Sequence, residues 1–367
     1  MKTDCGYPSA RSEKRFFDKE EMMNCSRRGF MGGIGALAGA GLASSAAAAA
    51  SGAGKDGEGV RFLAFADIHY SVGNFWPNAD REWLERILKR AVDEKVDFVM
   101  SLGDMTFGMA HGKVRDYVRW YNGFKPVKTY HTLGNHEFES TPPETVDEVF
   151  GLKCGYYSYD VKGFRFIVLD PHYHLKDGRL ERYSKRCSYP EEKVWCVLPP
   201  EEIAWLRKTV LTSPYPCVVF IHESIEPECG CVYNRSEALA VFAEANTKRP
   251  GTVRLVVNGH THKDHFRMLD GVAYLDLNSA SYDIYRKHNA YPEEFRRRCG
   301  SAECILTWND PLSAVITLTP DGGLKIDGAK SSFYLGVTPE MARWTTQSRG
   351  MGTVPWIQSV SMKIDYI

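Results

Sequence analysis

Several features are missing from this chain, and each absence excludes or disfavours a class of protein. Lysine and arginine together number 46, and aspartate and glutamate also number 46, so the formal net charge is zero. The positive excess typical of nucleic-acid-binding proteins is therefore absent, and we expect no strong nucleic-acid partner. No internal repeat is visible, which disfavours repeat architectures. Paired C-x-x-C spacings are also missing, which disfavours a structural zinc site.

Large apolar side chains are scarce in the uncharged stretch 29–54, which is rich in Gly and Ala. Because Gly and Ala contribute little transfer free energy, we expect no stable membrane span, although the length would suffice for one. No Cys follows this stretch, which disfavours a lipoprotein anchor. A flexible tail with an accidental arginine pair is the other alternative.

The residues just before this stretch resemble an export signal. Ser26-Arg27-Arg28-Gly29-Phe30-Met31 has the form of a twin-arginine motif. Small residues at Ala46–Ala50 offer cleavage sites. We predict a signal peptide over residues 1–50, cleaved near 46–53, and a linker over 51–59. The twin-arginine translocase would be a partner during export, and the mature protein would be periplasmic or extracellular.

Eight of the ten cysteines follow the predicted signal peptide, and an exported chain permits disulfides. Cys187 with Cys196, and Cys299 with Cys304, are plausible local pairs. Cys217 opens an apolar run and is expected to be a buried thiol.

Apolar runs alternate with amphipathic stretches along the rest of the chain. Strands are predicted at 60–66, 97–102, 127–133, 156–160, 164–169, 217–221, 253–257, 272–277 and 314–318. Helices are predicted at 80–96, 113–124, 200–211 and 236–245, the first with Trp83, Leu84, Ile87, Leu88, Ala91 and Val92 on one face. This alternation predicts an α/β fold with a parallel or mixed sheet covered by helices.

Metal-ligand side chains follow five of these strands. They lie in Asp67-Ile68-His69, Gly103-Asp104, Gly134-Asn135-His136-Glu137, His222 and Gly259-His260-Thr261-His262. Because strand ends converge at one edge of such a sheet, these loops should meet. Mixed oxygen and nitrogen ligands suit Zn, Mn or Fe, and the set is too large for one tetrahedral ion. Two metal ions of unknown identity are therefore expected.

Each of these residues has a plainer interpretation when it is taken alone. Asp67 and Asp104 would suit helix N-caps, Asn135 a turn, and His222 a satisfied strand-end histidine. Glu137 would either orient a ligand or lie on the surface. The ordered combination is what favours a metal site.

The complete series D-x-H, G-D, G-N-H-[DE], H, G-H-x-H resembles the calcineurin-like metallophosphoesterase family from about Val60 to Leu318. The resemblance implies a four-layer α-β-β-α sandwich, with a catalytic domain over 60–320 and a C-terminal extension over 321–367 packed on or beside it.

The resemblance also implies roles for single residues. Asp67, His69 and His262 would bind one metal, and Asn135, His222 and His260 the other. Asp104 would bridge the two. A hydroxide bridging the metals would attack phosphorus, with His136 as the acid that protonates the leaving group.

Family members with a ferric site carry a Tyr three residues after the G-D aspartate, where this chain has Phe107. The arrangement is closer to the class III cyclic nucleotide phosphodiesterases, and both phosphomonoesters and phosphodiesters stay open as substrates. His172, His174 and Arg179, near or within an apparent insertion at 171–197, are substrate-binding candidates, although solvated surface residues are an equal alternative. A metal-dependent nuclease and a non-catalytic scaffold of the same fold are the alternative functions.

Overall fold

The computed structural model describes residues 59–71, 81–139, 141–184, 194–228, 230–284, 289–338, 340–341 and 353–366. These residues all belong to one compact unit, Gly52–Ile367. The predicted signal peptide lies outside the described residues, and so does Cys187 of the first predicted disulfide.

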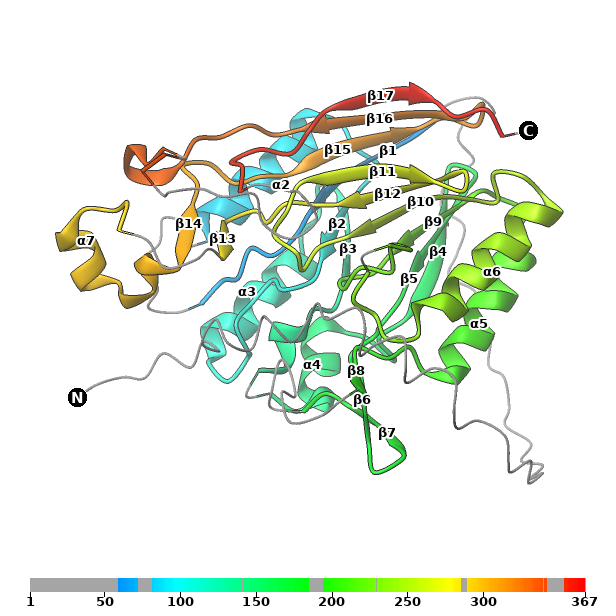
Figure 1. Ribbon diagram of the computed structural model, residues 1–367, viewed down its shortest axis with the longest axis horizontal. Helices are drawn as coiled ribbons and strands as arrows, with labels where there is room; N and C mark the ends of the chain where they lie inside the picture. The colour runs from blue at the N-terminus through cyan, green and yellow to red at the C-terminus, as the bar shows by residue number, and fades with distance from the viewer. Residues whose placement is uncertain are drawn as a thin grey trace. The chain divides into compact units, whose positions relative to one another are not determined.

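One six-stranded sheet carries the first three predicted strands at its edge. Its order is β17-β16-β15-β1-β2-β3 (Figure 1). The strands are β1 (Val60–Phe65), β2 (Phe98–Leu102), β3 (Lys128–Thr132), β15 (Ala314–Leu318), β16 (Gly323–Gly328) and β17 (Val360–Lys363). β1, β2 and β3 are parallel, and the other three pair antiparallel. Two strands from the segment 321–367 thus extend the sheet that contains β1.

A second six-stranded sheet has the order β11-β12-β10-β9-β5-β4. Its strands are β4 (Tyr157–Val161), β5 (Phe164–Val168), β9 (Cys217–Phe220), β10 (Val253–Asn258), β11 (His265–Leu269) and β12 (Val272–Asp276). The four inner strands are parallel, and β4 and β11 are antiparallel edges. Parallel inner strands aim their carboxyl ends at one edge, where the predicted ligands of this half of the chain follow.

Helices cover the outer faces of the two sheets. α2 (Glu82–Asp93) and α3 (Gly112–Asn122) pack on the first sheet, with α4 (Pro143–Phe150) beside α3. α5 (Pro200–Leu211) and α6 (Arg235–Lys248) lie side by side against the second sheet (Figure 1). Smaller elements complete the described fold: β6 (Tyr173–Lys176), β7 (Arg179–Arg182), β8 (Val194–Trp195), β13 (Tyr282–Ile284), β14 (Ile305–Thr307), α7 (Glu293–Arg298), and the 3-10 turns η2 (Asn135–Phe138), η3 (Gly300–Glu303) and η4 (Tyr334–Gly336).

The strand side chains alternate between two cores. Phe62 of β1 packs edge-to-face on Phe166 of β5 and Phe220 of β9, each 5.6 Å away, so the sheets face each other. The next residues along those strands, Ile167 and Val219, belong to the separate core with α5 and α6. Period-two alternation with both faces buried is what a doubly covered sheet requires. The predicted four-layer α-β-β-α fold is confirmed.

Two local predictions need correction. Val92 was placed on the buried face of its helix, but its side chain is 41% exposed, because it lies at the solvent-facing edge of the apolar stripe. The predicted Cys299–Cys304 bridge is not formed in the described part of the chain, where Cys299 is buried and Cys304 is exposed. Cys217 is buried at the start of β9, as predicted.

Candidate metal centre

The predicted ligand loops converge from both sheets. Asp67, Asp104 and Asn135 follow β1, β2 and β3 of the first sheet, whereas His222 and the loop at 259–262 follow β9 and β10 of the second. Backbone bonds join neighbouring loops: Asp67 N donates to Gly103 O at 3.1 Å, and Gly259 N donates to His222 O at 3.1 Å. The seven predicted ligands therefore lie along one rim, as the strand topology predicts.

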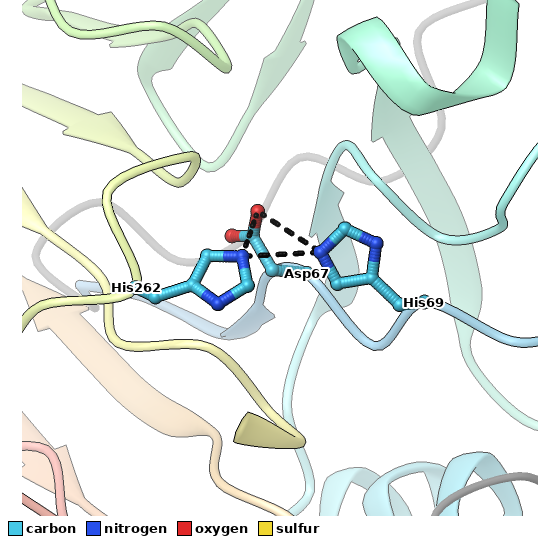
Figure 2. Close-up of side chains that lie close together, drawn as sticks. All are labelled: Asp67, His69 and His262. Atoms are coloured by element: carbon cyan, nitrogen blue, oxygen red, sulfur yellow. Dashed lines mark hydrogen bonds and ion pairs between the residues drawn. The ribbon is translucent and has the colours of Figure 1, made fainter. Parts of the chain in front are cut away.

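Three of these side chains form a tight group that we call subsite A: Asp67, His69 and His262 (Figure 2). His262 Nε2 lies 3.3 Å from Asp67 Oδ1 and 3.1 Å from His69 Nε2. His69 Nε2 lies 3.9 Å from the same Asp67 oxygen. All three side chains are at most 5% exposed. Three ligand atoms at these separations surround a volume of cation size.

A second group, subsite B, consists of Asn135, His222 and His260. His260 Nδ1 lies 3.0 Å from Asn135 Oδ1. The ligand atoms of His222, His260 and Asp104 all lie within 4.8 Å of one another. Asp104 stands between the subsites, because its Oδ2 is 3.1 Å from His222 Nε2 and 3.9 Å from His69 Nε2. The predicted bridging position therefore has the geometry that a shared carboxylate needs.

The loops hold several of these residues in a costly backbone conformation. Asp67, His69, Asp104, His260 and His262 all have positive φ, between 48° and 65°. Such a conformation costs a non-glycine residue about 1–3 kcal/mol, so the surrounding structure must fix it. Strain of this kind concentrates at functional sites.

Adjacent glycines allow the loops to approach this closely. A Cβ on Gly134 would lie 2.3 Å from Asp104 Oδ1, and one on Gly259 would lie 2.6 Å from Asp67 Oδ2. The glycines in the G-N-H and G-H-x-H patterns are therefore needed for space next to the carboxylates.

Backbone carbonyls fix the tautomers of two histidines. His222 Nδ1 donates to Leu102 O at 2.6 Å, and His262 Nδ1 donates to Tyr282 O at 2.7 Å. In the neutral ring this leaves the lone pair on Nε2, the atom that faces the centre. Each ring is thus oriented with its ligand nitrogen toward Asp104 or Asp67.

Burial and the nearby carboxylates shift the pKa values of the histidines at this centre in opposite directions. Burial alone would lower the pKa of His222, but Asp104, Asp67 and Glu223 outweigh it and raise that pKa well above its usual value. Burial lowers the pKa of His69 well below its usual value and also lowers that of His260, so both rings are neutral at neutral pH. Neutral imidazoles beside carboxylates are the form that binds a cation.

Buried groups behind the ligands hold their loops. The side chain of Glu137 is fully buried and accepts from Asp104 N at 3.0 Å, Thr106 N at 3.0 Å and Gly134 N at 2.6 Å. It therefore orients the Asp104 loop, which was one of its two predicted roles. Ser279 and Ser281 both donate to Asp67 O, at 2.8 and 3.0 Å. No sequence motif marks these two serines.

His136 lies at the edge of the centre. Its ring packs edge-on against His69 at 5.0 Å and against Phe107 at 4.5 Å, and its side chain is 18% exposed. Its Nδ1 lies 2.9 Å from Glu139 Oε2. Phe107 stacks on His69 with 4.5 Å between ring centroids, so this position packs against a ligand ring.

The three predicted substrate-binding residues differ in burial. His172 is fully buried, with Nδ1 2.5 Å from Asp170 Oδ1 and Nε2 3.2 Å from Glu223 Oε2. His174 is buried on β6, and Arg179 is exposed on β7. The structure does not bring Arg179 to the metal-ligand groups described above. Substrate binding by these three residues stays a prediction.

The buried ion-pair triad Asp170–His172–Glu223 predicts a pH-dependent stability. Burial alone lowers the pKa of His172, but Glu223 and Asp170 raise it from 6.5 to about 9. The stabilisation from this charged ring is thus complete below pH 6.5 and is lost as pH rises toward 9. The carboxyls of Asp170 and Glu223 have pKa values lowered to about 2, so their contribution is lost only in strong acid.

We expect His172→Gln to lower the free energy of unfolding by about 3–5 kcal/mol, because it leaves the buried Glu223 carboxylate without its partner, whereas Asp170 keeps its ion pair with Arg182. The difference from wild type should be largest between pH 4.5 and 6.5 and shrink as pH rises to 9. Urea unfolding of metal-free protein across this pH range measures it. A difference independent of pH would contradict the charged triad.

Comparisons with known proteins agree with this fold. A model of the family described as calcineurin-like phosphoesterase matches residues 60–264. A dimetal phosphatase from Danio rerio superimposes with a TM-score of 0.51 at 15% identity, covering 84% of this chain and 100% of that one. GAP50, described as the anchor in the inner membrane complex of Plasmodium, gives a TM-score of 0.49 at 13% identity, covering 84% and 90%. A search of curated protein sequences gave no match.

Fold and family together define a hydrolase that acts on phosphoester bonds. Since the family model spans more than half of the sequence, the chain belongs to the calcineurin-like phosphoesterase family. The dimetal phosphatase structure, at 15% identity, supports the fold alone. Across the described residues, none of the helices combines the length and apolar character needed to cross a bilayer.

Proposed function

We propose that this chain is a dinuclear metal-dependent phosphoesterase that hydrolyses small phosphomonoesters or phosphodiesters. One divalent ion would be held at subsite A by Asp67, His69 and His262, and the other at subsite B by Asn135, His222 and His260. Asp104 would serve both. The observation that carries the proposal is this pair of buried ligand groups sharing one carboxylate.

The donor chemistry supports the fit of cations. His222 Nε2 is buried and directed at Asp104 Oδ2 3.1 Å away, with its other nitrogen already bonded to a carbonyl. Two lone pairs in that position repel each other unless positive charge lies between them. The arrangement therefore favours either a proton or a metal ion, and mixed N/O donors suit Mn, Fe or Zn.

Such ions, when bound, polarise phosphoryl oxygens and lower the pKa of water. The protein's own part is to hold the ligands rigidly and to supply a proton. His136 is the donor that we assign, because it lies at the partly exposed edge of the centre, beside His69. Glu139 accepts from its Nδ1 and so leaves proton transfer to Nε2.

Export remains part of the proposal. The twin-arginine motif at Arg27 and Arg28 supports translocation of the folded protein and a periplasmic or extracellular location. Detection of a mature N-terminus near residues 46–53 in the exported fraction tests it. A cytoplasmic protein that keeps Arg27 would contradict it.

The central test combines metal content with a substrate panel. Purified protein should hold two metal ions per chain, and should hydrolyse p-nitrophenyl phosphate, bis-p-nitrophenyl phosphate or a cyclic nucleotide. Chelation should abolish this activity, and Mn²⁺ should restore it. Fewer than one ion per chain together with no hydrolysis across the panel would refute the proposal.

A further inference from the structure

The C-terminal segment 353–358 contacts the loop that follows His262 of subsite A, although it lies about ninety residues beyond that loop in the sequence. Thr353 is 1% exposed, and its hydroxyl donates to Asp283 Oδ2. Lys263, the neighbour of His262, forms a buried ion pair with the same carboxylate, and its Nζ also lies 3.3 Å from Thr353 Oγ1. Three groups from separate parts of the chain thus share one buried contact.

This cluster has a direct route to His262. Asp283 follows Tyr282 on β13, and the Tyr282 carbonyl accepts from His262 Nδ1 at 2.7 Å. The Tyr282 ring also stacks on His69 with 5.2 Å between ring centroids. Any shift of Asp283 would therefore move the carbonyl that orients one subsite A ligand and the ring that packs on another (Figure 2 shows both ligands).

A second route leads to Asp67. The amide of Asn278 donates to Val354 O at 2.7 Å and to Trp356 O at 3.0 Å. Ser279, the next residue, donates to Asp67 O at 2.8 Å. A third contact joins Gln358 N to Asp264 Oδ2 at 2.9 Å, two residues after His262. The segment is thus bonded directly to the loop after His262, and through Asn278 and its neighbour Ser279 it is linked to Asp67.

We infer that the C-terminal segment 353–358 is a positioning element that sets the metal affinity of subsite A, with Thr353 as its central contact. The inference rests on the proposed dinuclear function. Groups that orient a metal ligand from behind change metal affinity by about 10–100-fold when removed. Since Thr353 acts through Asp283 and Tyr282, we expect the lower end of that range.

The test titrates metal-free, full-length protein with Mn²⁺ by calorimetry, in two backgrounds that each keep one subsite. In His260→Ala, which keeps subsite A, Thr353→Val should weaken binding about tenfold. In His69→Ala, which keeps subsite B, Thr353→Val should change binding by less than about twofold. Thr353→Ser retains the hydroxyl and should restore the affinity of subsite A. Ser359→Ala is the matched control, because it removes the hydrogen bond that Gly328 N donates to the hydroxyl of the residue just after the segment.

Thermal unfolding of the metal-free variants shows whether each variant is folded before its metal binding is compared. Asn278→Leu, which breaks the bonds to Val354 and Trp356, is the second variant and should give the same selective loss. Equal weakening in both backgrounds, or none in either, would overturn the inference while leaving the dinuclear function intact. Wild-type protein that binds no Mn²⁺ would overturn both.

Discussion

Asp104→Asn is expected to lower phosphoester hydrolysis at least about a thousandfold and to reduce the metal content below two ions per chain. The substitution keeps the size of the side chain and the acceptor for His136 N, which is 2.8 Å from Oδ1. It removes the negative charge shared by the two subsites and places an amide opposite His222 Nε2. An N–H group there occupies the lone pair that a cation would need.

The same variant should leave the metal-free protein folded. In wild type the buried carboxylate faces His222 Nε2 at 3.1 Å, and an amide at that position donates a hydrogen bond without carrying a charge. Thermal unfolding with and without metal separates the effects. Asp160→Asn, which alters an exposed ion pair with Arg165, is the control and should retain full activity. Full activity of Asp104→Asn with two bound ions would contradict the shared carboxylate.

The convergence of the ligand loops at one rim was predictable, because it depends only on the order of strands and loops along the sequence. Asp67 and Asp104 each follow an apolar run, and a run with both faces buried marks an inner strand of a covered sheet, whereas Asn135 follows the edge strand β3. The carboxyl ends of such strands meet whatever the side chains of the connecting helices are. The order of strands along the sequence is therefore sufficient to predict that these loops meet.

The hydrogen bonds that hold the ligand loops from behind were not predictable, because they come from segments far away in the sequence. Ser279 holds the carbonyl of Asp67 from 212 residues away, and Thr353 reaches Asp283 from 70 residues away. A serine or threonine has no periodicity or spacing that distinguishes such a role from a solvated position. His172 illustrates the same limit: its spacing after a strand end suggested a pocket, whereas only tertiary packing brings Asp170 and Glu223 to its two nitrogens.

The shortest strands were not predicted from the sequence pattern, for one physical reason. Strands such as β6 and β8 are four and two residues long, too short for an alternation of apolar side chains to be visible. They are stabilised by pairing with each other and with β7. β16 and β17 form the antiparallel edge of the first sheet beyond β15. The resemblance to a family that is defined by its metal loops carries no information about such an edge.

His136→Gln is expected to lower the rate of hydrolysis in proportion to how poor the leaving group is. A positioned acid contributes about 10²–10⁴-fold when the departing oxygen needs a proton. An alkyl phosphate should lose activity in that range, because an alkoxide is a poor leaving group. Hydrolysis of p-nitrophenyl phosphate should fall less than about tenfold, since p-nitrophenolate departs without protonation.

The metal content of this variant distinguishes a proton donor from a metal ligand. The backbone N–H of His136 still bonds Asp104 after the substitution, so the variant should keep two ions per chain. His111→Gln, which alters an exposed cap of α3, is the control and should leave both rates unchanged. An equal loss on both substrates would indicate that His136 stabilises the phosphoryl group rather than the leaving oxygen. Loss of bound metal would instead make the ring a ligand, as its place beside His69 and Asp104 also permits.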